Sequence, residues 1–344
     1  MNLFCPYGIH RVIEPEGALP QGALKLDNRM EIRANELLID VETLNIDSAS
    51  FTQIRQEAND DPKRIAEIML NIVQERGKHH NPVTGSGGMF IGTVRSIGTH
   101  LQKRRDLKVG DRIASLVSLT LTPLVIEEVK TIHLETAQVD IKGQAILFES
   151  GIYAVLPGDL PEKLALAALD VAGAPAQTAK LVKPGDTVLI VGAGGKSGSL
   201  CLHEAKKRAG VSGRIIAMDY GETAVERVRQ LGLADVVLNV DATRPVACLT
   251  ALQEAGETLA DVTINCVNIS QTEMASILCT RDGGLVYFFS MATSFTAAAL
   301  GAEGVGKDVT MLIGNGYTHS HAAITLEVLR ENAKLRQLFA EIYV

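Results

Sequence analysis

The sequence contains no apolar run near the ~20 residues needed to cross a bilayer. Its start, MNLFCPYGIH, lacks the basic stretch and long apolar segment of a secretory signal. The five cysteines are odd in number and widely spaced, with no C-x-x-C pair, so we expect reduced thiols. Together these absences predict a soluble, cytoplasmic protein without a membrane partner.

Long blocks of lysine or arginine are also absent, and the net charge is −7. Nucleic acid is therefore not an expected partner. With 344 residues, 46% of them hydrophobic, the chain exceeds one ordinary core and predicts two domains.

The order of strand and helix patterns along the sequence predicts the fold of each domain. Residues 1–168 contain short strands separated by glycine and proline turns, as in a barrel-like, mainly β domain. Residues 169–315 alternate strand with helix, which predicts an α/β fold with a doubly wound parallel sheet covered by helices. One helical segment within residues 316–344 is expected to pack back on the first domain.

One helix is clearly predicted inside the first domain. Asp61 precedes Pro62, apolar residues recur at helical spacing, and Gly77 follows. This pattern combines a cap, a first-turn proline, one apolar face and a stop. We expect this helix to pack on the barrel without a chemical role.

A glycine-rich turn in the second domain carries the strongest functional signal. It follows the strand Thr187–Val191 and precedes a helix, where backbone N–H groups and the helix dipole hold phosphate. The next strand ends in Asp219, 21 residues beyond Gly198, where an acid accepts hydrogen bonds from both adenosine ribose hydroxyls. The turn therefore predicts a dinucleotide site.

The spacing within the turn departs from the common G-x-G-x-x-G. Ser197 stands at the third glycine position, so the glycines at 192, 195 and 198 fit G-x-x-G-x-x-G better and predict a longer loop. Two residues that end later strands are added because strand C-termini line the cofactor crevice. The predicted cofactor residues are Gly192, Gly194, Gly195, Lys196, Ser197, Gly198, Asp219, Tyr220, Asn268 and Ser290.

Asp219 favours NAD, because its charge repels a 2′-phosphate. NADP remains an alternative, since Lys196, Tyr220 and Arg227 would offset that repulsion.

Several stretches resemble the medium-chain dehydrogenase/reductase superfamily, in matching order. They are IGTVRSIG, LKVGDRIASL, VKPGDTVLIVGAGGKSG, RVRQLGLADVVLN and RDGGLVYFFS. The resemblance implies a GroES-like catalytic domain, a Rossmann domain and hydride transfer in a cleft between them. It also implies a homo-oligomer, a dimer or tetramer joined through the Rossmann sheets.

The zinc ligands of that superfamily are missing here. The corresponding stretches read NIDSASF, PVTGSGGMF and LDVAG, and they contain neither cysteine nor histidine. A four-cysteine lobe is absent as well, so we predict no metal. The histidines at 79, 80, 319 and 321 complete no ligand set and are expected on exposed loops.

The resemblance also places candidate catalytic residues. Aligning on FTQIR puts Ser48 near the lost first ligand and Ser50 near a proton-relaying hydroxyl. Ser86, or one of the two glycines after it, replaces the ligand histidine, and Asp170 lies beside the third position. An alternative for Asp47 and Ser48 is that they cap a helical turn.

Further stretches, including CPYGIHRVIEPEGALPQGALKLDN and NPVTGSGGMFIGTV, resemble zinc-free dehydrogenases that deaminate a small diamino acid in lysine fermentation. In such a reaction the ammonium must first lose a proton, for which the candidates are Asp47, Ser48, Ser50 and Ser86. A carboxylate would stabilise the imine, and Asp47 or Asp170 is the candidate.

Two other functions stay open at this point. The metal-free site and the glycine spacing also fit a quinone or enoyl reductase. A dinucleotide-binding protein without turnover is the third alternative, because a fold alone does not fix a function.

Overall fold

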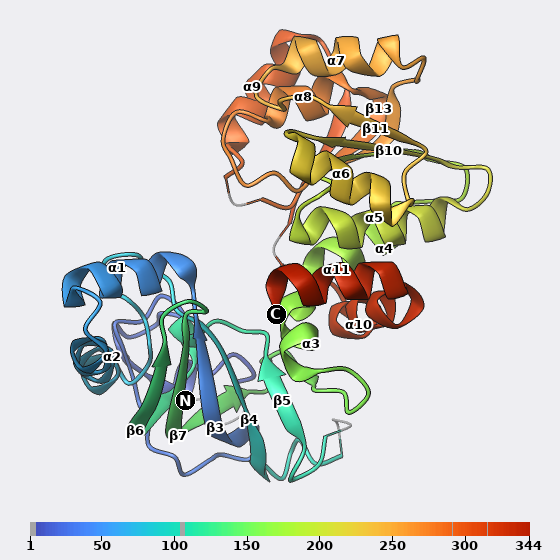
Figure 1. Cartoon of the computed structure of the whole chain (residues 1–344). Coiled ribbons are helices and arrows are strands. Elements are labelled where there is room, and N and C mark those ends of the chain that lie inside the picture. The colour runs from blue at the N-terminus through green and yellow to red at the C-terminus, as the bar shows by residue number, and fades with distance from the viewer. Residues whose placement is uncertain (1–4, 104–106, 291, 315) are drawn as a thin grey trace. The chain divides into compact units, whose positions relative to one another are not determined.

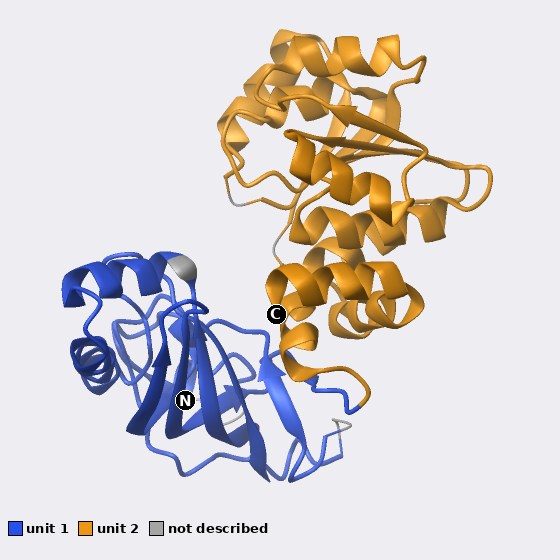
Figure 2. Ribbon diagram, viewed as in Figure 1, with its two compact units in different colours: residues 1–158 blue, residues 159–344 orange. Residues whose placement is uncertain are grey.

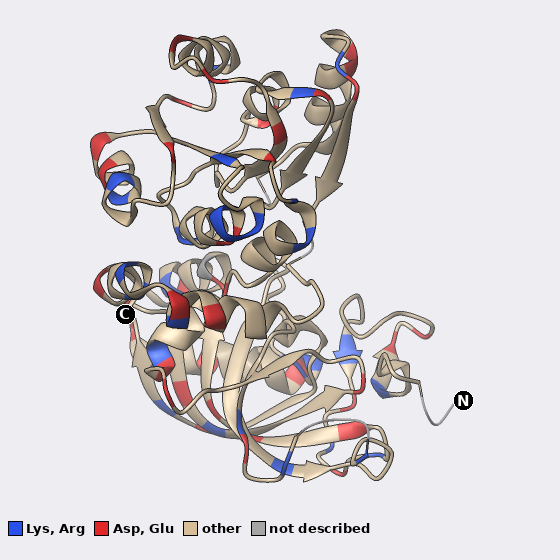
Figure 3. Ribbon diagram, turned by 90° about the vertical axis from the view of Figure 1, so that its right-hand side faces the viewer, with Lys and Arg blue, Asp and Glu red and all other residues tan. Residues whose placement is uncertain are grey.

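The computed structural model describes residues 5–103, 107–290, 292–314 and 316–344. The chain forms two compact units, residues 1–158 and residues 159–344 (Figure 2). Acidic and basic residues alternate along the ribbon of both units (Figure 3). Every helix within the described ranges is too short or too polar to cross a bilayer. All five cysteines fall in these ranges, and each is a free thiol.

The first unit is built on a six-stranded antiparallel sheet, as the mixed short strands predict (Figure 1). A two-stranded sheet and two 3-10 turns, η1 (Ile9–Arg11) and η2 (Leu119–Leu121), complete it. In spatial order the large sheet contains β6 (Leu124–His133), β7 (Gln138–Phe148), β3 (Glu36–Ile46), β4 (Gly88–Ile97), β5 (Arg112–Ser115) and β8 (Tyr153–Val155), and the small one β1 (Val12–Glu14) and β2 (Lys25–Leu26).

The predicted helix is present as α2 (Pro62–Arg76). The Asp61 carboxylate accepts a hydrogen bond from the Lys63 N–H at 3.0 Å, and Gly77 ends the helix with φ 67°. A full helix, α1 (Ser48–Ala58), stands where only a helical turn was considered. It forms because Phe51, Ile54 and Ala58 bury one face of it in the core that α2 also covers.

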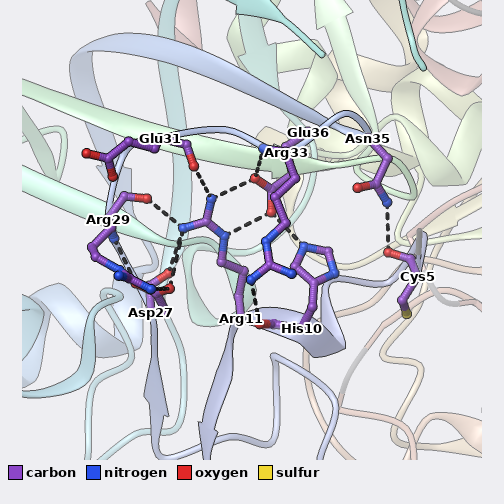
Figure 4. A network of polar contacts seen from close by, with 9 residues as sticks. All are labelled: Cys5, His10, Arg11, Asp27, Arg29, Glu31, Arg33, Asn35 and Glu36. Atoms are coloured by element: carbon purple, nitrogen blue, oxygen red, sulfur yellow. Dashed lines mark hydrogen bonds and ion pairs between the residues drawn. The ribbon is translucent and has the colours of Figure 1, made fainter. Parts of the chain in front are cut away.

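A network of buried charges fastens the N-terminal segment to this unit (Figure 4). Arg11 is 2% exposed and binds Glu36 through two hydrogen bonds of 2.9 and 2.7 Å. The His10 Nε2 lies 2.7 Å from the same carboxylate. Burial raises the pKa of Glu36, but hydrogen bonds from His10, Arg11 and the Arg33 N–H outweigh it and bring that pKa to about 2.

The second unit contains a six-stranded parallel sheet, which confirms the predicted α/β class. Successive residues of each central strand enter different cores. Val188 and Ile190 of the strand β9 pack under helices on one face, whereas Leu189 and Val191 pack on the other. The spatial order is β11 (Val236–Asn239), β10 (Arg214–Asp219), β9 (Thr187–Val191), β12 (Ala260–Asn265), β13 (Thr280–Phe288) and β14 (Val309–Ile313).

Helices cover both faces of this sheet. One core takes side chains from α4 (Gly173–Leu181), α5 (Lys196–Ala209) and α6 (Glu222–Leu231). The helices α7 (Pro245–Glu254), α8 (Glu273–Leu278) and α9 (Phe295–Gly304) supply the cores of the other face.

The C-terminal segment forms two helices, not one. The helices α10 (His321–Glu331) and α11 (Ala333–Tyr343) are separated at Asn332, whose side chain caps α11 by accepting from the Leu335 N–H at 3.0 Å. They pack on α3 (Glu162–Leu169), α4 and α5. The compact units therefore differ in extent from the predicted domains, because α3 and the C-terminal helices group with the parallel sheet.

Candidate functional site

A pocket of about 640 Å³ opens at the carboxyl ends of the parallel strands. It lies where β9 and β12 pair and the strand order reverses, the usual ligand position in such sheets. Most of the predicted cofactor residues line it, namely Gly192, Gly194, Gly195, Lys196, Ser197, Asp219, Asn268 and Ser290. The predicted substrate residue Asp170 lines it as well.

The glycine turn owes its sequence to close backbone approaches. Gly192 has φ 80°, which favours glycine. A methyl group on Gly194 would lie 2.5 Å from the Ala224 carbonyl oxygen, and one on Gly198 would collide with the Gly192 carbonyl. At Gly195 the nearest atom would be 3.4 Å away. Glycine is therefore required at positions 192, 194 and 198, and not at 192, 195 and 198 as predicted. The loop is still one residue longer than in G-x-G-x-x-G.

The turn fits a dinucleotide diphosphate. Gly195 is exposed and precedes the first residue of α5, so helix N–H groups and the positive end of the helix dipole face the pocket. Gly198 is buried beneath the turn and does not line the pocket, so it allows close packing of α5 on the turn and does not contact a ligand.

Asp219 ends β10 beside this turn. Its carboxylate accepts from the Gly194 N–H at 2.6 Å and from the Tyr220 N–H at 2.7 Å. These bonds hold it at the pocket with lone pairs left for ribose hydroxyls. The Tyr220 side chain is 69% exposed and is not part of the pocket lining, whereas Arg227 is.

The Asp170 carboxylate is already paired. Its Oδ2 lies 3.0 Å from the Lys196 Nζ, and both side chains are partly exposed. A substrate ammonium at Asp170 would therefore compete with Lys196. Other lining residues were not predicted as cofactor contacts. Cys266 and Val267 directly follow β12, Phe289 directly follows β13, and Gly316 lies beyond β14.

In the first unit, three predicted catalytic residues, Asp47, Ser50 and Ser86, belong to one hydrogen-bonded group. Asp47 is exposed, and its carboxylate accepts from the Gly87 N–H at 3.0 Å. The Ser86 hydroxyl is half-buried and lies 2.9 Å from the Thr84 hydroxyl. Ser50 is fully buried. The Ser48 side chain lies outside the described part of the structure.

Asn81 organises these residues, and no motif in the sequence predicts this role. Its side-chain amide donates to the Ser50 Oγ at 3.0 Å and to Gln53 at 2.8 Å. Its carbonyl oxygen accepts from the Val83 N–H at 2.8 Å, and its own N–H binds the Ser86 carbonyl oxygen. Asn81 is buried and thereby ties α1 to the loop that carries Ser86.

The expectation of exposed histidines is wrong at three of the four positions, since His79 and His321 are buried and His80 is half-buried. His79 is completely buried, and burial, with the charge of His80, lowers its pKa to about 4. The residue before it, Lys78, is buried as well, and its ammonium donates a hydrogen bond to the Pro20 carbonyl oxygen at 2.7 Å. Residues 78 and 79 are therefore not on an exposed loop. His321 is 5% exposed, while His319 is exposed as expected.

One group in the described part could hold a metal by geometry. Ligand atoms of His203, Glu204 and Glu331 lie within 4.8 Å of one another. Cations already bind both carboxylates, Lys207 at 2.6 Å from Glu331 and Arg208 at 3.0 Å from Glu204. None of the three is a predicted site residue, and we assign no metal to them.

Comparison with known proteins identifies close relatives. Residues 10–157 match the family described as L-erythro-3,5-diaminohexanoate dehydrogenase N-terminal domain. The chain is 61% identical to the L-erythro-3,5-diaminohexanoate dehydrogenase of Acetoanaerobium sticklandii over 99% of both chains. It is 59% identical to that of Fusobacterium nucleatum subsp. nucleatum over the whole of both.

Solved structures show the fold. An alcohol dehydrogenase of Thermotoga maritima has a TM-score of 0.53 at 16% identity, covering 90% of this chain and 85% of its own. A mycobacterial protein in complex with NADPH has a TM-score of 0.52 at 18% identity, covering 93% and 84%. The dehydrogenase relatives and this NADPH complex together support a nicotinamide cofactor.

The two named relatives match this chain along almost its entire length and almost theirs. With its medium-chain dehydrogenase/reductase fold, the chain belongs to the L-erythro-3,5-diaminohexanoate dehydrogenase family.

Proposed function

We propose that this chain catalyses the NAD-dependent oxidative deamination of L-erythro-3,5-diaminohexanoate to 5-amino-3-oxohexanoate and ammonia in the cytoplasm. The observation that carries the proposal is the 61% identity to a dehydrogenase of that name over 99% of the chain. When bound, the nicotinamide would accept a hydride from the carbon that bears the amine, and water would then hydrolyse the resulting imine to the ketone and ammonia. The chain itself supplies binding, orientation and proton transfer.

Binding of the cofactor rests on the second unit. The N–H groups of the glycine turn and the start of α5 hold the diphosphate, and Asp219 accepts from the adenosine ribose hydroxyls. The Asp219 charge is the reason for preferring NAD. Arg227 lies in the same pocket and is the residue that would admit NADP.

Proton transfer rests on the first unit. Asp47 is exposed and its carboxylate is oriented by the Gly87 N–H, so we assign it as the base that takes a proton from the substrate ammonium. Ser86 is the second candidate. Ser50 acts behind them as a support, since it is buried and held by Asn81.

Asp170 is proposed to receive an ammonium of the substrate. Its ion-pair partner Lys196 is the first residue of α5, where the helix dipole disfavours a cation. Lys196 is also a candidate to bind the cofactor diphosphate. Diphosphate binding to Lys196 would release Asp170, so this assignment implies that cofactor precedes substrate.

We also propose a homo-oligomer joined through β14. This strand is at the edge of the parallel sheet, and Ile313 at its end is 61% exposed. An unpaired strand edge with apolar side chains favours association with a second copy.

The test is turnover of the purified chain with the diamino acid, followed by the absorbance of reduced nicotinamide. We expect reduction of NAD at a higher kcat/KM than NADP. A quinone or enoyl substrate in place of the diamino acid should give no oxidation of the reduced cofactor; turnover of a quinone alone would overturn the proposal.

A further inference from the structure

The second unit contains another pocket, of about 610 Å³, and none of its described lining residues belongs to the dinucleotide pocket. Its walls come from α4, the end of α5, the strands β13 and β14, and the start of α10 with the segment before it. All of these elements lie within residues 159–344. Small-molecule sites commonly occupy ~300–1,000 Å³, so the pocket is large enough for a ligand of its own.

The charged side chains that line this pocket are basic. They are Lys180 and Arg208, and the described lining contains no aspartate or glutamate. Lys180 is exposed and forms no ion pair with a described residue. The Arg208 Nε donates to Glu204 at 3.0 Å, whereas its two terminal nitrogens make no hydrogen bond within the described ranges. In a chain with a net charge of −7, this local positive charge favours an anionic ligand.

A buried hydroxyl opens into the same pocket. Tyr287 is 2% exposed and packs in the core that α4 and α5 share with the sheet. Its hydroxyl forms no hydrogen bond with a described residue, yet it is not among the polar atoms sealed from solvent, so it faces the pocket that Tyr287 lines. Burial raises the pKa of Tyr287, which keeps this hydroxyl a donor at neutral pH. An acceptor in the pocket would offset the cost of leaving that donor without a partner.

The rest of the lining combines a further donor with apolar surface. The Gln177 side-chain oxygen accepts from the Thr318 hydroxyl at 2.6 Å, which leaves its amide nitrogen as a donor. Leu312 and Ile324 add apolar side chains. Several donors with an apolar wall suit an organic molecule that carries one anionic group.

We propose that this pocket is a second binding site, which takes a small organic molecule carrying an oxyanion, either a phosphate or a carboxylate. Lys180 and Arg208 bind the oxyanion through charge-assisted hydrogen bonds, and the Tyr287 hydroxyl adds a neutral one. Since the lining is separate from the dinucleotide pocket, binding here requires neither cofactor nor substrate and does not depend on the proposed function.

The experiment is titration calorimetry of the full chain with two probes, inorganic phosphate and hexanoate. Lys180→Gln removes one charge from the pocket and should weaken binding about tenfold, the effect of a charge-assisted hydrogen bond. Tyr287→Phe removes the hydroxyl but keeps the ring in the core, and we expect binding about fivefold weaker. Lys183→Gln is the matched control, because Lys183 is exposed in the same unit and does not line the pocket; it should bind as the wild type.

The variants distinguish this pocket from other places where an anion could bind. Binding of either probe that weakens in Lys180→Gln and Tyr287→Phe, but not in Lys183→Gln, supports the proposal, and the tighter probe identifies the oxyanion. Binding of neither probe overturns it. Binding that both pocket variants leave unchanged also overturns it, because the anion is then held elsewhere, as at the glycine turn. Light scattering accompanies each titration, since Ile313 at the proposed interface also lines the pocket; a loss of affinity that occurs only with a changed mass contradicts direct binding.

Discussion

Single glycines in the dinucleotide turn differ in what they contribute, and the difference can be measured. Gly198→Ala would place a methyl group against the Gly192 carbonyl, so we expect a loss of about 2–3 kcal/mol in unfolding free energy. Gly195→Ala meets its nearest atom at 3.4 Å and is the matched control, expected within about 0.5 kcal/mol of the wild type. Denaturant titration followed by circular dichroism distinguishes the two. Equal stability of both variants would contradict the steric argument.

Asn81 provides a second prediction at the residue scale. Asn81→Ala leaves the buried Ser50 hydroxyl without its donor and the Val83 N–H without its acceptor. We expect the unfolding free energy to fall by about 2–3 kcal/mol, with kcat reduced because the loop carrying Ser86 loses its tie to α1.

Ser50→Ala is the comparison for that variant. It removes only one of the Asn81 bonds, so about 1 kcal/mol should be lost and most of the activity kept. Loss of activity in Ser50→Ala at full stability would show that Ser50 acts in proton transfer after all.

The sequence was informative about residues whose role is local. The glycine turn, Asp219 and the absence of zinc ligands follow from short stretches of chain. Asn81 was missed because its function depends on partners 31 and 28 positions away.

At the scale of elements, the N-terminal segment depends on Glu36. Its pKa is lowered to about 2 from an ordinary value of 4.5. A lowered pKa means that the folded state favours the charged form. This contribution, on the order of 3 kcal/mol, is complete above pH 4.5 and is lost as the pH falls toward 2.

Unfolding free energies measured across that pH range test this element. Glu36→Gln should flatten the dependence between pH 4.5 and 2 relative to the wild type. It should also lower stability at neutral pH, since Arg11 then stays buried with fewer charge partners. The exposed Glu67→Gln should leave the wild-type slope intact. An unchanged slope in Glu36→Gln would contradict the role given to this network.

Elements with strong local signals were predicted well, and those defined by packing were not. The helix α2 carries a cap, a proline and a stop glycine in sequence, and it begins and ends accordingly. The helix α1 has no comparable start, so its extent became clear only from the face that it buries. The division between α10 and α11 depends on one cap, Asn332, within a continuous helical pattern.

At the scale of the whole molecule, the proposed homo-oligomer can be tested at its proposed interface, the edge strand β14. Ile313→Glu places a charge on the exposed end of the edge strand β14 and should shift the mass found by light scattering toward the monomer. Val211→Glu, at a fully exposed position in the same unit, should keep the wild-type mass. A monomeric wild type, or an unchanged mass in Ile313→Glu, would contradict the proposed interface.

The overall class was predictable because alternating strands and helices leave few arrangements of a parallel sheet. The extents of the two compact units were not, since α3 and the C-terminal helices join the second unit through contacts between distant parts of the chain.

If the chain removes an amine from its substrate with a nicotinamide cofactor, nitrogen must be released as the cofactor is reduced. Ammonia and reduced cofactor should be measured together during turnover of L-erythro-3,5-diaminohexanoate with NAD. We expect them in a one-to-one ratio, and we expect the reverse reaction to require ammonium. Reduced cofactor without ammonia, or a reverse reaction that proceeds equally well without ammonium, would contradict it.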